Sequence, residues 1–389
     1  MSEQNGVLPS QWIRSAFADG ITSATQPLTP DQIQPNSLDL RLDKTGHRVQ
    51  CSFLPGDDGM RQKLSRFGWY EFAIPDEGIV LERNQIYLFP LSESLRLPAK
   101  VYGRANPKSS TGRLDVFTRL VTEYGTSFDR VPSGYTGKLY LEVVPRSFAI
   151  RVRSGDSLAQ MRFQVGNPRL SVEETIALLD SETILLSNAL EPLNAADVAT
   201  VSGMTLSIHL PQKNETIGYQ ARRNTAPIDL RARGMARRNH WDWLYGDGKP
   251  VILEPDDFYI FRSSEVVRLP PEYCAEMVAF DASSGEVRTH YAGFFDSGFG
   301  YIEGKPAHET AAAVVLEVRS RDVPFFIEDR QPLFRVHLLR CTEPPDMLYG
   351  SIPGSNYQTQ RLRLSKQFNA SPDAADDERT QPRLDFSGA

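Results

Sequence analysis

An internal repeat constrains the fold of this 389-residue chain more than any other feature. The stretch IVLERNQIYLFPLSESLRLP (79–98) resembles VILEPDDFYIFRSSEVVRLP (251–270), so that Leu81 corresponds to Leu253 and Arg96 to Arg268. Further along, LYLEVV resembles VVLEVR, so that Glu142 corresponds to Glu317. Two matches at nearly one offset predict a tandem duplication of one structural unit.

Each repeated unit is predicted to be a β domain. Up to about residue 165, short apolar or alternating runs are separated by Gly and Pro, which is typical of a compact β-barrel or jelly roll. SLDLRL (37–42) alternates like a half-buried strand, and PIDLRA (227–232) is interpreted as its echo. A few short helices are expected, one within residues 10–20 and one that begins at a capping box within 171–186.

The domain boundaries follow from this repeat. The helix within 171–186 is interpreted as the start of a connection, so residues 1–200 are predicted to form the first β domain and residues 201–370 the second. Residues 371–389 are polar and contain proline, and they are expected to be a disordered tail.

Composition excludes several classes of protein. The 40% hydrophobic content is enough to bury two cores. The net charge of −6 argues against a general nucleic-acid surface. No apolar run reaches the ~18 residues of a membrane span, no signal-peptide pattern precedes the first helix, and the three cysteines form no C-x-x-C pair. We expect a soluble cytoplasmic protein that binds neither nucleic acid nor membrane.

One polar cluster is a candidate phosphate site. Ser109 and Ser110 lie between Lys108 and Arg113, so that hydroxyl, backbone and cationic donors occur together. The alternative is an ordinary polar turn between strands. The cluster is not a Walker loop, because the G-x-x-x-x-G-K-[ST] pattern is absent.

Glu142 is the candidate proton carrier. It is the only carboxylate in an apolar strand and shares a strand face with Tyr140 and Val144. In a dry pocket its pKa would rise toward neutrality, which suits acid–base work. The alternative is a cross-strand ion pair on a wet face. Asp39 and Asp229 are interpreted as structural groups at strand ends.

The pattern of histidines and cysteines predicts no zinc site. The six histidines form neither H-E-x-x-H nor the H-x-E and C-x-x-C pair of zinc deaminases. No G-x-S-x-G elbow indicates a serine hydrolase. A bound nucleoside triphosphate would still bring Mg²⁺, held mostly by phosphate and water.

The order of the motifs resembles the dCTP deaminase family, in its long, tandem-duplicated form. The resemblance rests on the N-terminal helix, IQPNSLDLRL, KSSTGRLD, the D…P-S-G-Y-T-G loop, LYLEV and a tail with NYQTQ. It implies a mainly β fold of two tandem dUTPase-like distorted jelly-roll or barrel domains with a few short helices. It also implies a homotrimer, because the family shares its trimeric β fold with dUTP pyrophosphatases.

The resemblance implies roles for residues of the first copy and the tail. Ser109, Ser110 and Arg113 would bind the nucleotide and orient the attacking water, and Glu142 would be the general base and acid. The remaining expected contacts are Lys108 to phosphate, the backbone of Tyr140 and Leu141 to the pyrimidine, Asp129 to the deoxyribose, and Tyr357 and Gln360 closing over the triphosphate.

The implied reaction is zinc-independent deamination of dCTP to dUTP and ammonia, which would feed dUMP and dTTP synthesis. Mg²⁺ would accompany the triphosphate, and dTTP would be a possible feedback inhibitor. One alternative is a bifunctional deaminase and dUTP pyrophosphatase, or a dUTPase, although the tail lacks a Gly-rich phosphate-closing motif. A second alternative is a non-catalytic nucleotide-binding β protein.

The second copy is predicted to be degenerate. Where the first copy has S-S-x-x-R, the second reads MVAFDASSGE (277–286). Substitution of Glu142 with glutamine is therefore expected to abolish turnover, and the same change at Glu317 to do little. The DSGFG loop (296–300) or the tail is expected to complete a site formed by the first copy of a neighbouring subunit.

Overall fold

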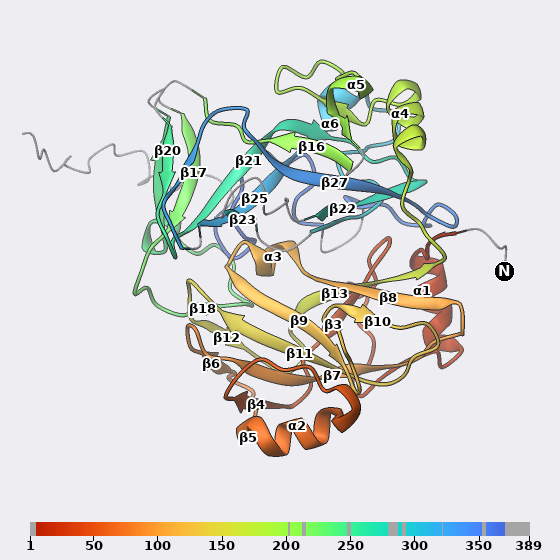
Figure 1. Cartoon of the computed structure of the whole chain (residues 1–389), viewed down its shortest axis with the longest axis vertical. Helices are drawn as coiled ribbons and strands as arrows, with labels where there is room; N and C mark the ends of the chain where they lie inside the picture. The colour runs from red at the N-terminus through yellow and green to blue at the C-terminus, as the bar shows by residue number, and fades with distance from the viewer. Residues whose placement is uncertain are drawn as a thin grey trace, which may run out of the picture.

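The protein folds as two β-rich halves stacked on one another (Figure 1). The structure is a computed structural model. It describes residues 5–200, 203–211, 215–246, 250–278, 287–289, 293–320, 322–351 and 355–369. The predicted disordered tail, 371–389, lies outside the described residues.

Two large antiparallel sheets form most of the first half, and β6 and β12 pair separately. One large sheet has the order β5-β4-β7-β11-β9 with β2 beside β7, and the other has the order β1-β13-β8-β10 with β3 beside β13. The elements are β1 (Gly6–Val7), α1 (Ser10–Ala18), β2 (Thr22–Ala24), β3 (Leu38–Arg41), β4 (Thr45–Val49), η1 (Gly56–Asp58), α2 (Gly59–Phe67), β5 (Gly68–Ala73), β6 (Ile79–Leu81), β7 (Tyr87–Arg96), β8 (Val101–Pro107), α3 (Ser109–Gly112), β9 (Val116–Thr122), β10 (Arg130–Val131), β11 (Thr136–Pro145), β12 (Ile150–Val152) and β13 (Ser157–Val165).

The second half repeats this arrangement. Its sheets have the orders β19-β17-β21-β25-β23, with β14 beside β21, and β15-β16-β27-β22-β24. The elements are α4 (Val172–Ser181), β14 (Leu185–Leu186), α5 (Ala195–Val198), β15 (Ala199–Thr200), β16 (Gly203–Ser207), β17 (Thr216–Ala221), β18 (Ile228–Asp229), η2 (Arg237–Asn239), β19 (Trp241–Tyr245), β20 (Val251–Leu253), β21 (Phe258–Val267), β22 (Tyr273–Val278), β23 (Val287–Thr289), β24 (Phe294–Phe295), α6 (Ala307–Thr310), β25 (Ala312–Ser320), β26 (Phe325–Ile327) and β27 (Pro332–Arg340).

Fine details of the backbone confirm the duplication. Asn84 and Asp256 occupy equivalent positions of the repeat, in the turns before β7 and β21, and both have positive φ angles, 59° and 62°. In the first turn the backbone N–H of Glu82 donates to the hydroxyl of Tyr87 at 3.2 Å. In the second turn the backbone N–H of Glu254 donates to the hydroxyl of Tyr259 at 3.0 Å. Asn and Asp tolerate this left-handed conformation better than most residues. Both copies therefore form this turn with the same backbone conformation and the same hydrogen bond.

Strand register fixes the equivalence of the two glutamates. Glu142 on β11 pairs with Leu88 on β7, and Glu317 on β25 pairs with Ile260 on β21. Leu88 and Ile260 are themselves equivalent positions in the repeat that aligns Leu81 with Leu253. Glu142 and Glu317 thus occupy the same place in the two sheets.

The boundary between the halves lies near residue 170, not near residue 200. Thr22 on β2 pairs with Leu95, and Leu185 on β14 pairs with Val267, which makes β14 the counterpart of β2 and the preceding α4 the counterpart of α1. Leu178 of α4 belongs to the core of the second half. The capping box does start a helix, but that helix opens the second unit instead of connecting the two.

The echo of SLDLRL was also misplaced. In the first half, β3 pairs with β13, with Leu40 opposite Ala159. In the second half the strand in this position is β16, with Leu206 opposite Phe334 on β27. The PIDLRA segment instead forms β18, which pairs in parallel with β12 of the first half. A short Asp-Leu-Arg match therefore marked a crossing between the halves and not a repeat of the strand.

Two segments of the second half cross onto the first. Residues 222–240 bring β18 to β12, and they deliver Trp241, whose side chain is completely buried against Phe148 and Phe368. Phe368, near the end of the described chain, joins the core of the first half. The halves therefore share a continuous apolar interface. No helix among the described residues is long and apolar enough to span a membrane.

Candidate active site between the two halves

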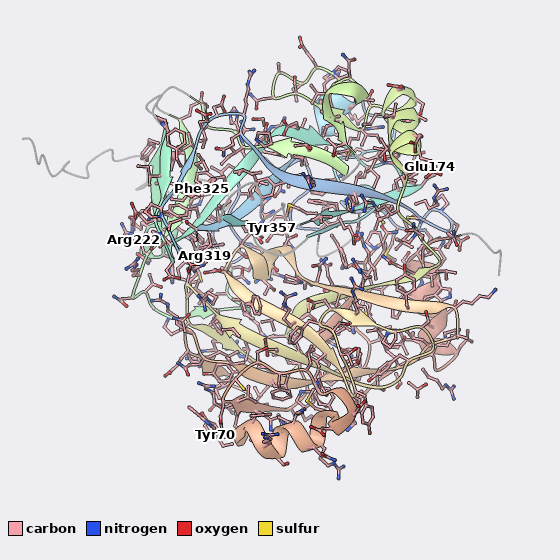
Figure 2. All side chains as sticks on the ribbon, in the orientation of Figure 1. Tyr70, Glu174, Arg222, Arg319, Phe325 and Tyr357 are labelled. Atoms are coloured by element: carbon pink, nitrogen blue, oxygen red, sulfur yellow. The ribbon has the colours of Figure 1, made fainter. Side chains whose placement is uncertain are left out.

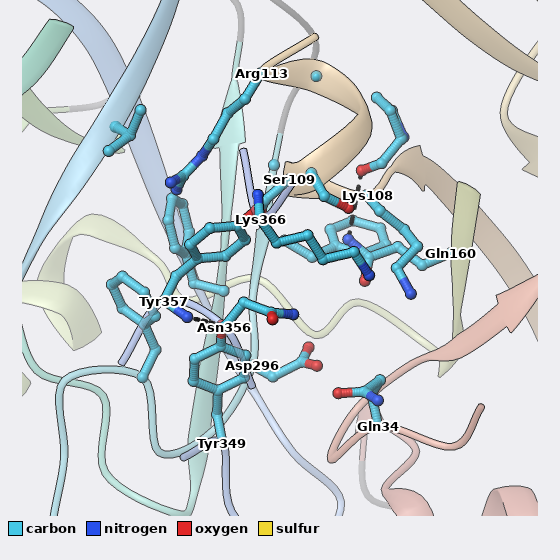
Figure 3. A pocket seen from close by; sticks show the side chains of 18 of the residues that line it. Gln34, Lys108, Ser109, Arg113, Gln160, Asp296, Tyr349, Asn356, Tyr357 and Lys366 are labelled. Atoms are coloured by element: carbon cyan, nitrogen blue, oxygen red, sulfur yellow. Dashed lines mark hydrogen bonds between the residues drawn. The ribbon is translucent and has the colours of Figure 1, made fainter. Parts of the chain in front are cut away.

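A pocket of about 110 Å³, open at its mouth, lies between the two halves (Figure 3). The first half, the second half and the C-terminal tail all contribute to its lining, which consists of Asp31, Gln34, Asp39, Pro107, Lys108, Ser109, Ser110, Gly112, Arg113, Gln160, Met277, Gly293, Phe294, Phe295, Asp296, Phe299, Val315, Glu317, Tyr349, Asn356, Tyr357, Gln360 and Lys366.

The predicted phosphate cluster forms one wall. Lys108 ends the extended run after β8, and its backbone N–H donates to the carbonyl of Leu158 on β13 at 2.9 Å. The chain then turns once as α3, so that Ser109 and Ser110 face the pocket. Ser365 of the tail donates its hydroxyl to the carbonyl of Ser110 at 2.7 Å. α3 is thus held from both sides at the junction of the halves (Figure 1).

The tail fixes Arg113. The guanidinium of Arg113 donates to Gln360 Oε1 at 2.9 Å and to the carbonyl of Arg363 at 3.0 Å. The guanidinium carbon lies 3.8 Å from the centre of the Tyr357 ring, a cation–π arrangement. Figure 3 shows Arg113 and Tyr357 together on one side of the pocket. The structure therefore brings the predicted tail residues Tyr357 and Gln360 to the predicted cluster.

The glutamate in this pocket is Glu317, not Glu142. Glu317 projects from β25 against the backbone of α3, and a Cβ built on Gly112 would lie only 2.3 Å from its Oε2 atom. The side chain is buried, and this burial raises its pKa to about 8. The nearby Arg113 charge opposes that rise in pKa, and Asp115 adds to it. Glu317 can therefore exchange a proton near neutral pH.

The DSGFG loop supplies the opposite wall. Asp296 accepts from Arg162 Nη2 at 2.8 Å and from the hydroxyl of Ser37 at 3.3 Å, so both partners come from the first half. Phe299 of the same loop and Tyr349 add aromatic faces, with ring centres 5.8 Å apart. The loop and the tail thus line the same pocket as the cluster of the first half. They do so within one chain, whereas the sequence had suggested a neighbouring subunit.

Two lysines and a carboxylate mark a charged end of the pocket. Lys108 forms an ion pair with Asp39, which was expected to be purely structural. Burial and, after it, the positive charge of Lys108 together lower the pKa of Lys366 to about 8. Burial also raises the pKa of Asp39, against the pull of Lys108. An anionic ligand here would favour both lysines in their charged form.

The other predicted site residues lie elsewhere. Glu142 is buried beside Ser52 and Arg119, and its pKa is raised mainly by that burial. Asp129 forms an ion pair with Arg119 at 2.7 Å. The hydroxyl of Tyr140 donates to Glu123, and Leu141 packs in the core of the first half. None of the four lines the pocket that holds Ser109, Ser110 and Arg113.

Glu142 lies outside the pocket and Glu317 inside it because different segments of the chain cover the two sheet faces on which they lie. In the first half, the connection between β4 and β5 folds back as α2, and Met60, Phe53 and Leu64 pack on the face of Leu88 and Tyr140. Figure 1 shows α2 at the end of the first half that is farthest from the second. Glu142 is therefore sealed beneath its own chain.

In the second half, the matching connection between β17 and β19 leaves the equivalent face open. It crosses to the first half as residues 222–240, and the sheet residues Ile260 and Val315 pack into the core cluster of the first half. Because this face is open toward the first half, Glu317 meets α3. The duplication itself indicates this arrangement. Because the chain contains two copies of the unit, the second copy can take the place that a neighbouring subunit would otherwise fill.

Several pocket residues were not predicted from sequence, notably Asp296 in its own right, Gln34, Gln160, Phe294, Tyr349 and Lys366. Only the DSGFG motif pointed to any of them. The second-copy segment compared with S-S-x-x-R lies almost entirely outside the described residues, which stop at Val278 and resume at Val287. Within the described chain, no three His, Cys, Asp or Glu side chains group as metal ligands would.

The fold and the pocket together define a duplicated β protein whose pocket between the halves is lined by Lys108, Arg113 and the buried Glu317. Residues 4–167 match the family described as 2'-deoxycytidine 5'-triphosphate deaminase N-terminal domain, and residues 173–368 match the C-terminal domain of the same family. The chain belongs to the 2'-deoxycytidine 5'-triphosphate deaminase family.

Individual relatives agree with this assignment. A crystal structure of 2'-deoxycytidine 5'-triphosphate deaminase from Agrobacterium tumefaciens is 42% identical, with a TM-score of 0.82 over 90% of this chain and 99% of that one. The dCTP deaminase of Ignicoccus hospitalis is 27% identical over 38% of this chain and 77% of its own length. A dUMP-forming dCTP deaminase of Bifidobacterium adolescentis is 28% identical over 42% of this chain and 81% of its own length.

Proposed function

We propose that this protein hydrolyses dCTP to dUTP and ammonia, and that its product supplies dUMP and dTTP synthesis. The observation that carries the proposal is the contact of Glu317 with α3, next to Arg113 and the hydroxyls of Ser109 and Ser110. This arrangement places a carboxylate that can carry a proton beside side chains that can bind phosphate and water.

In the proposed reaction, Glu317 takes a proton from a water held by Ser109 and Arg113. The water oxygen bonds to C4 of cytosine, and Glu317 passes the proton it has taken to N3. Glu317 then takes the second proton of the water from the new C4 hydroxyl and gives it to the N4 amine. The C4–N4 bond breaks, ammonia leaves and the C4 carbonyl of uracil forms. The backbone of Val315 and Leu316 takes the pyrimidine-reading role first assigned to Tyr140 and Leu141. Such proton transfer contributes about 10²–10⁴-fold to a rate.

The rest of the nucleotide is assigned from the pocket walls. We assign the deoxyribose to Asp296 in place of Asp129, since Asp296 lines the pocket and Asp129 does not. The triphosphate would meet Lys108 and Lys366, with Tyr357 and Gln360 closing over it. Mg²⁺ would be held mainly by phosphate oxygens and water and would neutralise charge there. The nearby carboxylate of Asp39 has one buried oxygen without a hydrogen-bond partner, which suits a water of that ion.

Zinc independence is part of the proposal. Zinc in proteins is bound chiefly by His and Cys, and the described residues that line the pocket include neither. The homotrimer and dTTP inhibition also remain predictions. All three cysteines are free thiols, which suits the proposed cytoplasmic location.

A second candidate is the dUMP-forming reaction named for several relatives. One assay separates the candidates: incubation with dCTP and Mg²⁺ while ammonia, dUTP and pyrophosphate are followed. We expect ammonia and dUTP without pyrophosphate. Release of pyrophosphate would favour the dUMP-forming reaction or a dUTPase, and no product would favour a non-catalytic nucleotide-binding protein.

The rate should depend on pH through two pocket groups. The free enzyme needs ionised Glu317, so kcat/KM should rise with pH up to about 8, where its pKa lies. Phosphate binding needs charged Lys366, so kcat/KM should fall again above about 8. We expect Lys366→Met to remove the alkaline fall and to raise KM for dCTP. An unchanged alkaline limb in that variant would contradict the assignment of Lys366.

A further inference from the structure

Arg319 is a second charged residue on the pocket side of β25. It follows Glu317 by two residues and so lies on the same face of the strand. Its guanidinium forms an ion pair with Asp115 of the first half and donates to the hydroxyl of Ser147 at 3.1 Å. Ser147 in turn donates to Asp115 Oδ2 at 2.6 Å. Figure 2 shows Arg319 at the junction of the two halves.

Asp115 is tied rigidly to α3. It follows Arg113 by two residues with a φ of 54°, and its side chain is fully buried. Its backbone N–H donates to the carbonyl of Gly112 at 2.8 Å, and its own carbonyl accepts from Arg146 at 2.9 Å. Arg319 therefore links the strand of Glu317 to the turn whose Gly112 touches the Glu317 carboxylate.

The internal repeat shows that the β scaffold does not require this arginine. When Glu317 is aligned with Glu142, Arg319 corresponds to Val144 on β11. Val144 is an apolar, buried residue in the half whose glutamate is sealed by its own chain. The charged residue therefore occurs only in the strand that meets the other half.

We propose that Arg319 and Asp115 are positioning residues that hold the Glu317 carboxylate against α3 across the junction of the halves. The proposal rests on the proposed deamination and adds that the Arg319–Asp115 ion pair sets the position of the Glu317 carboxylate. A small displacement of a reacting group can cost about 100-fold in rate. Breaking this link should thus reduce turnover more than substrate binding.

The test uses Arg319→Met and Asp115→Asn in the full chain. We expect each to lower kcat for dCTP by about 10- to 100-fold, with KM changed by less than about threefold. The matched control is Arg153→Met, which removes another ion pair between the halves, the two-bond contact of Arg153 with Asp229 at 2.7 and 2.8 Å. That pair joins the end of β12 to β18 and contains no residue of β25 or of the α3 turn, so the control should keep kcat.

A second readout does not depend on turnover. The Asp115 charge raises the pKa of Glu317, so Asp115→Asn should lower it. Infrared titration of the Glu317 carboxyl, assigned by its loss in Glu317→Gln, would measure this shift. Wild-type kcat in Arg319→Met, an equal loss in Arg153→Met, or an unmoved Glu317 titration in Asp115→Asn would each overturn the proposal. Absence of ammonia from the wild-type protein would instead refute the proposed function.

Discussion

Replacing Glu317 with glutamine is expected to lower kcat for dCTP by about 10²–10⁴-fold, the usual contribution of a general acid–base group. Glutamine has nearly the same shape but cannot carry the proton between water and the cytosine ring. Binding of dCTP should change little, because the cationic residues Lys108, Arg113 and Lys366 remain. Ammonia release and equilibrium dialysis with dCTP would measure the two effects separately.

Glu142→Gln is the matched control for this prediction. The two glutamates occupy the same position in their sheets, but Glu142 is sealed under α2 and lies outside the pocket. We expect this variant to keep the wild-type kcat. This reverses the expectation from sequence, in which Glu142 was the working residue. A loss of turnover in Glu142→Gln with normal turnover in Glu317→Gln would contradict the pocket described here.

Replacing Gly112 with alanine is expected to lower kcat by about 100-fold. The new Cβ would lie 2.3 and 2.6 Å from the two oxygens of Glu317, closer than non-bonded atoms can approach. Because Glu317 is buried on a strand, its carboxylate must move away from α3. Gly112 does not adopt a positive φ, so alanine should not strain the backbone itself.

Thr111→Ala is the control on the same helical turn. Thr111 does not line the pocket, and its truncation introduces no atom near Glu317. Thermal unfolding of both variants would show whether the fold is intact, and steady-state kinetics would give kcat and KM. A wild-type kcat for Gly112→Ala would mean that the Glu317 carboxylate does not act from its place against α3.

Much of the fold was predictable from local patterns. Alternating runs, turn residues and the repeat predicted two β units, because strand patterning and tight turns depend on residues close in sequence. The pocket cluster of Lys108, Ser109, Ser110 and Arg113 was predicted for the same reason. Tyr357 and Gln360 were predicted by motif, and in the structure they contact Arg113, about 250 residues earlier in the chain.

The boundary and the strand echo were wrong for a physical reason. α4 has the capping box of any surface helix, and nothing local distinguishes a helix that opens a domain from one that connects two. PIDLRA resembles a strand of the first copy, but its parallel pairing with β12 depends on a crossing between halves that local patterns do not specify.

By itself, the sequence determined that this protein is a duplicated β chain with a cationic Ser-Ser cluster and two equivalent glutamates. Only the tertiary structure decided which glutamate meets that cluster. Glu142 and Glu317 lie in nearly identical strands, so strand pattern and propensity treat them alike. The difference is what covers the sheet face: α2 folds back over Glu142, while residues 222–240 cross to the first half and leave Glu317 open to α3. Such covering depends on contacts between residues distant in sequence, which no local pattern encodes.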